Sequence, residues 1–210
     1  MPKKRYHMLK YLLMIVAIIA LIIFFKKETP EVIKLNSTDK ILAFGDSITY
    51  GYGESKNKSY PYLLSKITNV PVLNAGVNGD TSREGLQRLP ALLEDNSVKL
   101  ILLCFGGNDI LQNIPLIELK DNLKKMIQMA KSKNIDVILI SVPKVSSLGL
   151  SSLALYSTVA KEENVELMDD LLVHVLSRSS LKNDYIHPNA KGYRYMANEI
   201  YKHLKSNKWI

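Results

Sequence analysis

A serine lies directly after a short apolar run, where its hydroxyl group could act as a nucleophile. The run from Ile41 to Phe44 is followed by Gly45, Asp46 and Ser47. Gly, Asp and Ser are also common turn formers, so this segment alone does not separate a nucleophile from a turn. A serine attacks an acyl carbon only when a base removes its proton, and that base is typically a histidine oriented by a carboxylate. A suitable histidine therefore decides the role of Ser47.

The sequence has four histidines to consider for this task. His7 precedes an apolar segment, His174 lies in a helical-looking context, and His203 lies beside lysines in the last predicted helix, where we expect a solvated side chain. His187 lies in a loop, and Asp184 precedes it by three residues, close enough to accept a hydrogen bond from the imidazole. The alternative is that D-x-x-H-P-N is only a turn whose asparagine caps the following helix.

Acyl transfer also requires hydrogen-bond donors for the oxyanion. Gly76 permits close approach of the backbone, so its N–H could point into a site. The side-chain amide of Asn108 and the backbone N–H of Ser47 are the other candidates. A plain loop glycine and a turn asparagine are the alternatives for the first two.

The elements that must position these residues alternate between strand and helix. Strands are predicted at 40–44, 70–74, 100–105, 137–142 and 165–168, and helices at 60–68, 82–93, from 115 onward, 152–163 and 189–205. Thr81 and Glu84 are spaced as a capping box for the second helix, and Leu116 is expected on the inward face of the third. This alternation predicts a parallel sheet covered on both faces, with the ligand site beyond the carboxyl ends of the strands.

Four blocks of the sequence, in this order, resemble the SGNH (GDSL-type) hydrolases. They are "GDSIT" at 45–49, "NAGVNGDTS" at 74–82, "GGND" at 106–109 and "DYIHPN" at 184–189, and the resemblance runs from about 40 to 205. "GDTSREGLQRLPALL" is most similar to bacterial thioesterase I, arylesterase and lysophospholipase-type enzymes of that family. The implied fold of residues 39–210 is a flavodoxin-like three-layer α/β/α sandwich with a parallel sheet of about five strands.

The resemblance also implies roles for individual residues. Ser47 would be the nucleophile, His187 its base, and Asp184 the carboxylate that orients the base. Ser47, Gly76 and Asn108 would form the oxyanion hole. The implied activity is a serine esterase that hydrolyses acyl esters or thioesters through an acyl-serine intermediate, with no metal and no cofactor.

The segment after the fourth strand bears on the substrate. Its sequence, "VPKVSSLGLSSLALY", departs from the family pattern. Four leucines in it favour a lipophilic acyl group: Leu148, Leu150, Leu153 and Leu155. A shallow polar cleft would instead suit a carbohydrate O-acetyl esterase. A third hypothesis, a non-catalytic binding module, leaves the pairing of Ser47 with the Asp184/His187 loop unexplained.

The N-terminal residues have the pattern of a membrane-targeting segment. Residues 1–27 combine four basic residues, an apolar run from 11 to 25 and two closing lysines, and residues 28–38 form a polar linker. Fifteen residues of helix span about 22 Å, short of a hydrocarbon core of about 30 Å. The bulky residues before the lysines lack a cleavage signature, which favours an uncleaved single-pass anchor with the catalytic domain outside the cytoplasm. A cleaved signal, with a secreted or periplasmic product, is the alternative.

The distribution of charge argues against a nucleic-acid-binding protein, and the single cysteine is expected to be structural. The chain has a net charge of +8, but six of its 28 basic and two of its 20 acidic residues precede Val32, which leaves a net charge of +4 for the remainder. No basic stripe with interleaved aromatics is present, so we expect no nucleic-acid partner. The single cysteine, Cys104, lies in an apolar run and is expected to be a buried hydrophobe.

Overall fold

The computed structural model describes His7 and residues 11–16, 34–146 and 149–210. The chain divides into two units, Met1–Val32 and Ile33–Ile210. In the first unit residues 11–16 are helical, and the rest of the predicted apolar run lies outside the described residues. Among the residues that the structure describes, no helix combines the length and the apolar character needed to cross a membrane.

The second unit is built on a five-stranded sheet in which every neighbouring pair is parallel. The strand order is β2-β1-β3-β4-β7. The strands are β1 (Lys40–Gly45), β2 (Val72–Gly76), β3 (Val98–Cys104), β4 (Asp136–Ile140) and β7 (Glu166–Met168). The predicted α/β fold with a parallel sheet of about five strands is confirmed.

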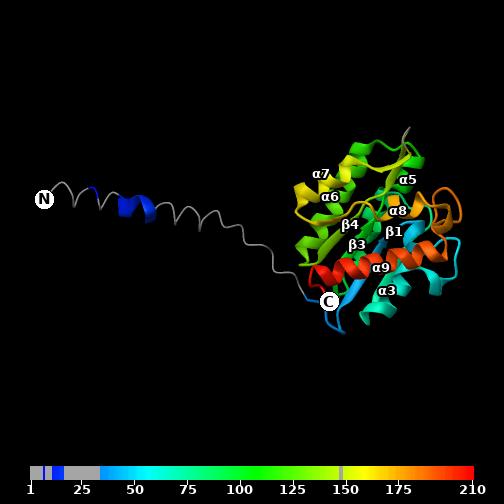
Figure 1. Cartoon of the computed structure of the whole chain (residues 1–210), viewed down its shortest axis with the longest axis horizontal. Helices are drawn as coiled ribbons and strands as arrows, with labels where there is room; N and C mark the ends of the chain where they lie inside the picture. Colours follow the sequence, from blue (N-terminus) through cyan, green and yellow to red (C-terminus); the bar gives the residue numbers. More distant parts are fainter. Residues whose placement is uncertain (1–6, 8–10, 17–33, 147–148) are drawn as a thin grey trace. The chain divides into compact units, whose positions relative to one another are not determined.

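Helices cover both faces of the sheet (Figure 1), which makes three layers. On one face α3 packs against α9, with α8 beside α9, and on the other α6 lies between α4 and α7. Their bounds are α3 Tyr60–Thr68, α4 Ser82–Leu92, α6 Leu116–Ser132, α7 Ala154–Glu163, α8 Leu171–Leu176 and α9 Ala190–Ser206. Four short helices lie in the connections: α2 Ser47–Tyr50, α5 Gly107–Leu111, and the 3₁₀ turns η1 Lys56–Lys58 and η2 Ser179–Leu181.

The core lies where the central strands meet these helices. β1 and β3 are buried almost throughout, because strands covered on both faces expose neither set of side chains. Cys104 is fully buried, and this burial raises the pKa of its thiol well above the ordinary value, so it is a core hydrophobe as predicted. The predicted capping box of Thr81 and Glu84 is present at the start of α4.

Helix α6 buries its predicted face with one exception. Leu119, Leu123 and Met126 are buried, whereas Leu116 is 42% exposed. The expectation for Leu116 was wrong because Pro115 is the N-cap and Leu116 is the first helical residue, ahead of the turns that pack on the sheet. The His203 side chain, which was expected to be solvated, instead lies against β7, with its Nε2 2.5 Å from Oε2 of Glu166.

Several element boundaries differ from the sequence-based predictions by one or two residues, and two of these differences have local reasons. β2 begins at Val72 rather than at Val70, because the backbone N–H of Val70 is bonded to the Thr68 hydroxyl group in the turn that ends α3. The segment after β4 forms an antiparallel hairpin of β5 (Pro143–Ser146) and β6 (Gly149–Ser152). Helix α7 therefore begins at Ala154 rather than at Ser152.

Candidate active site

The sheet order reverses between β1 and β3, and the candidate site lies at the carboxyl end of these two strands. The chain leaves β1 toward β2 and then crosses back to form β3, which makes this edge a topological switch point. Ser47 follows β1 as the first residue of α2, and Asp46 caps that helix by accepting a hydrogen bond from the N–H of Ile48 at 3.0 Å. A Cβ at position 45 would collide with Thr49 and with the carbonyl oxygen of Cys104, so the sharp exit from β1 needs a glycine.

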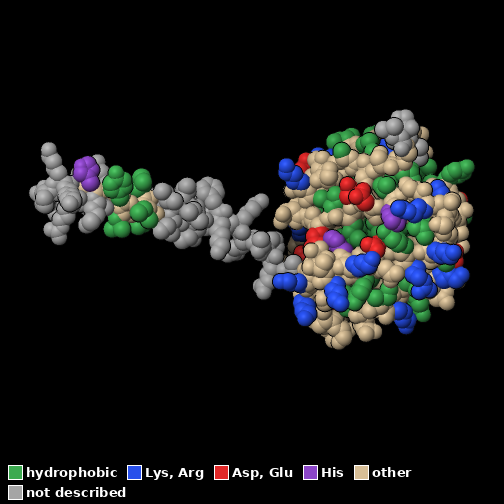
Figure 2. Space-filling model, viewed as in Figure 1, with side chains coloured by type: hydrophobic (Ala, Val, Ile, Leu, Met, Phe, Trp, Pro, Cys, Tyr) green, Lys and Arg blue, Asp and Glu red, His purple; other side chains and the backbone are tan. Residues whose placement is uncertain are grey.

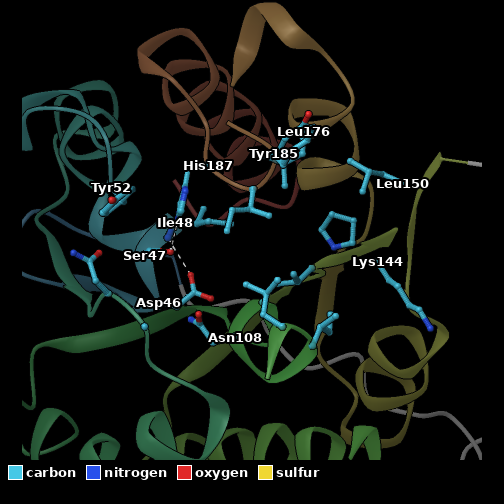
Figure 3. A pocket seen from close by; sticks show the side chains of 18 residues that line it. Asp46, Ser47, Ile48, Tyr52, Asn108, Lys144, Leu150, Leu176, Tyr185 and His187 are labelled. Atoms are coloured by element: carbon cyan, nitrogen blue, oxygen red, sulfur yellow. Dashed lines mark hydrogen bonds between the residues drawn. The ribbon is translucent and has the colours of Figure 1, made fainter. Parts of the chain in front are cut away.

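Ser47, His187 and Asp184 are brought together across the domain. Oγ of Ser47 lies 3.0 Å from Nε2 of His187, and Nδ1 of His187 lies 2.9 Å from Oδ2 of Asp184. Figure 3 shows the His187 ring directed at Ser47. The Tyr52 ring lies against the imidazole, with 4.5 Å between the ring centroids. The structure therefore places Ser47 beside His187 and His187 beside Asp184, which are the pairings expected from the sequence.

A four-residue turn fixes the orientation of His187. Oδ1 of Asp184 accepts the backbone N–H groups of Ile186 and His187, each at 2.8 Å, while Oδ2 faces the imidazole. Partial burial acts to raise the pKa of Asp184, but the hydrogen bonds from His187 and from the two backbone amides outweigh it and lower that pKa. Asp184 is therefore held as a carboxylate that faces Nδ1.

Gly76, one of the three expected oxyanion donors, is not brought into this site. Its backbone N–H donates to Oδ1 of Asn74 at 3.0 Å, and a Cβ at position 76 would collide with the backbone nitrogen of Tyr50. The glycine is needed for close packing of β2 against α2. Gly79, three residues later in the same block, lines the cavity beside Ser47 instead.

The turn from Val77 to Asp80 presents Gly79 to the cavity. The N–H of Asp80 donates to the carbonyl oxygen of Val77 at 3.3 Å, and Gly79 has a φ of +85°. L-residues with side chains rarely adopt this conformation, so a glycine belongs at this position. The two glycines in "NAGVNGDTS" therefore have different structural environments, which the sequence does not distinguish.

Asn108 lies in the first turn of α5, at the end of β3, and lines the same cavity. Its Nδ2 donates to the carbonyl oxygen of Asp80 at 2.8 Å. A side-chain amide has two N–H donors, so this bond orients the group and leaves the second donor for a ligand. The N–H of Ser47, in the first turn of α2, has no partner within its own helix.

A cavity of about 300 Å³ opens beside Ser47. Ser47, Asn108 and His187 lie at its polar end (Figure 3). The apolar side chains that line it are Ile48, Tyr52, Ile110, Leu111, Val142, Pro143, Leu150, Leu176, Tyr185 and Ile186. Lys144 of the hairpin also contributes.

The leucines of the hairpin region differ in whether they reach this cavity. Leu150, Leu153 and Leu155 all pack against the hydrophobic core, and Leu150 also lines the cavity. Of the leucines that favour a lipophilic acyl group, Leu153 and Leu155 are not among the residues that line the cavity. Leu148 lies outside the described residues.

Asp46 and Asp109 are buried and Asp80 is partly buried, and sequence reasoning had given none of these three aspartates a role. Asp109 is fully buried and accepts two hydrogen bonds from Ser82, one from the backbone N–H at 2.9 Å and one from the side-chain hydroxyl group at 2.5 Å. Burial, together with the charges of Asp109 and Asp80, raises the pKa of Asp46 to about 7, although the bond from the Ile48 N–H acts against the shift. Asp80 is paired with Arg88 at 2.6 Å.

Comparison with known proteins defines the class to which this fold and site belong. The chain belongs to the GDSL-like lipase/acylhydrolase family, whose model matches residues 43–195. Members of this class are serine hydrolases that act on ester bonds, and this chain is one of them.

Individual relatives agree with this assignment. The chain is 30% identical over 203 residues to an arylesterase from Vibrio mimicus, covering 90% of this chain and 100% of that protein. It is 31% identical over 176 residues to thioesterase 1/protease 1/lysophospholipase L1 of Escherichia coli K12, covering 80% and 85% of the two chains. Among solved structures, the psychrotrophic esterase EstA from Pseudoalteromonas sp. aligns with a TM-score of 0.71 at 25% identity, covering 80% of this chain and 97% of that chain.

On the face of the molecule drawn in Figure 2, Lys and Arg side chains are scattered over the domain rather than gathered in one stripe. Within the described part of the chain, no cluster of three or more His, Cys, Asp or Glu side chains has the arrangement of a metal site.

Proposed function

We propose that Ser47 is the nucleophile of a two-step ester hydrolysis and that His187 is its general base. Oγ of Ser47 bonds to the carbonyl carbon of the substrate while its proton passes to Nε2 of His187. Asp184 stabilises the imidazolium that forms. Nε2 then donates the proton to the leaving alcohol or thiol. Water attacks the acyl-serine in the second step with His187 again as base, which releases the acid and restores Ser47. The contacts of 3.0 Å and 2.9 Å within this set carry the proposal.

The oxyanion donors in this proposal are the N–H of Ser47, the N–H of Gly79 and the side-chain amide of Asn108. Gly79 replaces Gly76 because it lines the cavity and because the N–H of Gly76 is already bonded to Asn74. The N–H of Ser47 and the amide of Asn108 lie in the first turns of α2 and α5, and the N–H of Gly79 lies in the turn from Val77 to Asp80. Such preorganised donors stabilise charge that develops in the transition state.

We further propose that the substrates are esters or thioesters of lipophilic acyl groups. The relatives named arylesterase and thioesterase 1/protease 1/lysophospholipase L1 support this class. The apolar lining of the cavity beside Ser47 also supports it, since burying an acyl chain contributes about 0.8 kcal/mol per CH₂ group. A carbohydrate O-acetyl esterase, the alternative, would not use a cavity of this size and character.

Labelling with a fluorophosphonate tests the mechanism independently of the natural substrate. The wild-type protein and the control variant Ser132→Ala, which changes an exposed serine on α6, should both be labelled. Ser47→Ala should not be labelled, and His187→Ala should react far more slowly. A Ser47→Ala protein that still turns over esters would refute the covalent mechanism.

A panel of aryl esters, acyl thioesters, lysophospholipids and acetylated sugars tests the substrate class. For each ester series, kcat/KM should rise from acetyl to medium acyl chains until the cavity is filled. A rate that is highest for acetylated sugars and falls with chain length would favour the O-acetyl esterase instead.

We also propose that residues 1–27 carry the catalytic domain to the outer side of the cytoplasmic membrane. The support is the sequence pattern, in which four basic residues precede the apolar run and two follow it. Protease treatment of wall-stripped cells that express a C-terminally tagged protein should remove the tag while the membrane is intact. The mass of the recovered protein then separates an uncleaved anchor from a cleaved signal.

A further inference from the structure

Arg88 of α4 reaches under the turn that forms one wall of the catalytic cavity. Its Nε lies 2.6 Å from Oδ2 of Asp80, and its Nη2 donates to the carbonyl oxygen of Gly45 at 2.9 Å. The guanidinium group also lies over the Phe44 ring, 4.4 Å from its centroid. These three contacts hold the side chain in one orientation, as a planar guanidinium group with several directed donors can.

Asp80 connects Arg88 to both of the proposed oxyanion donors outside Ser47. The carbonyl oxygen of Asp80 accepts the amide of Asn108 at 2.8 Å, and its backbone directly follows Gly79. The carboxylate that Arg88 holds therefore belongs to the residue that orients Asn108 and ends the Gly79 turn.

Gly45 connects Arg88 to the nucleophile side of the site. The carbonyl oxygen of Gly45 accepts both Nη2 of Arg88 and the N–H of Val77, the latter at 3.2 Å. Gly45 lies two residues before Ser47, so one guanidinium group spans the strand end that carries the nucleophile and the turn that carries Gly79.

Burial makes this arrangement costly to disturb. The side chains of Arg88 and Asp80 are only 26% and 12% exposed. Asp80 also adds to the negative charge around the buried Asp46. Without the guanidinium group the Asp80 carboxylate would be left nearly buried and unpaired, and we expect the turn to shift toward water to relieve it.

We propose that Arg88 is a positioning residue for the oxyanion hole, acting through Asp80 on Gly79 and Asn108. It does not line the cavity and does not touch the substrate. The inference rests on the proposed function, since it assigns a task relative to donors named there. It goes beyond that function because it places a determinant of the reaction rate on the outer side of the Gly79 turn.

Steady-state kinetics on a soluble short-chain ester test the proposal. Arg88→Met should lower kcat by about 10- to 100-fold, less than the 10²- to 10³-fold typical for loss of one donor, because the donors are displaced rather than removed. KM should change by less than about threefold. Arg88→Lys keeps the charge but cannot make both directed contacts, and it should recover only part of the loss. The matched control is Arg83→Met on the same helix, which breaks the exposed ion pair with Glu118 and should leave kcat unchanged.

A double-mutant cycle separates positioning from a general loss of structure. If Arg88 acts through Asn108, Arg88→Met should have a much smaller effect on kcat in an Asn108→Ala background than in the wild type. Fully additive losses, or a rise in KM at constant kcat, would overturn the proposal. If Arg88→Met does not fold, the same cycle with Arg88→Lys gives the answer. Turnover by Ser47→Ala would instead refute the proposed function, so the two failures are distinguishable.

Discussion

Replacing Asp46 by Asn should change how the stability of the domain depends on pH. Asp46 is 2% exposed, and its pKa is raised from 3.8 to about 7. Between these values the folded state holds a proton at Asp46 that the unfolded state has released. Stability from this group is therefore complete below about pH 4 and is lost as the pH rises through 7.

The size of the effect follows from the shift. Three pKa units correspond to about 4 kcal/mol, at about 1.4 kcal/mol per unit, and about 3 kcal/mol of this falls between pH 5 and pH 8.5. Asn carries no titratable proton and can still accept the N–H of Ile48 through its carbonyl oxygen. The free energy of unfolding of Asp46→Asn minus that of the wild type should therefore increase by about 3 kcal/mol from pH 5 to pH 8.5.

Urea unfolding at several pH values measures this difference. The relevant quantity is the free energy of unfolding of Asp46→Asn minus that of the wild type, so that all other titrating groups cancel. The matched control is Asp121→Asn on α6, where the side chain is exposed. A difference for Asp46→Asn that stays constant from pH 5 to pH 8.5 would refute the view that Asp46 is protonated in the folded protein below neutral pH.

Three further changes have defined outcomes. Asn108→Ala should lower kcat by about 10²- to 10³-fold with a smaller change in KM, and a pure KM effect would mean that Asn108 binds the ground state. Gly76→Ala should lower the free energy of unfolding in urea, because its Cβ would collide with the backbone of Tyr50; a stable variant that lacks only kcat would return Gly76 to the oxyanion hole. Glu166→Gln should lower the free energy of unfolding by about 1–2 kcal/mol at pH 6 and by much less at pH 3. Partial burial acts to raise the pKa of Glu166, but hydrogen bonds from His203, Trp209 and Asn207 outweigh it and lower that pKa. Thermal unfolding at the two pH values measures this, and an equal loss at both would contradict it.

Most of the fold could be predicted because its three central strands are nearly continuous apolar runs and its long helices have a clear period. The apolar runs that form β1, β3 and β4 have no polar alternation, which is typical of strands buried on both faces of a sheet. The one-turn helices α2 and α5 are too short for a periodic pattern to indicate them. The hairpin of β5 and β6 contributes Pro143, Lys144 and Leu150 to the lining of the cavity, and its mixed Ser and Leu sequence has no alternation that indicates strands.

Part of the candidate site could also be predicted from the sequence, and the rest could be found only in the structure. Ser47, Asp184 and His187 could be chosen from the sequence because each lies in a short motif with its neighbours close along the chain. The ion pair of Arg88 with Asp80 could not, since the two residues are eight apart and lie in different elements. The choice between Gly76 and Gly79 also needs the structure, because it depends on which of two glycines packs against α2.

The hydrogen bond between Ser47 and His187 joins residues that are 140 positions apart in the chain. Asp184 and His187 lie directly before α9, the last helix, whose first turn is held by Glu54 through the N–H of Ala190 at 2.9 Å. The proposed nucleophile is therefore synthesised early, and its proposed base is synthesised almost at the end. If these two residues form the catalytic pair, the pair is incomplete until α9 packs beside α3. We therefore expect recovery of activity during refolding to follow the docking of the C-terminal helix rather than the formation of the central strands.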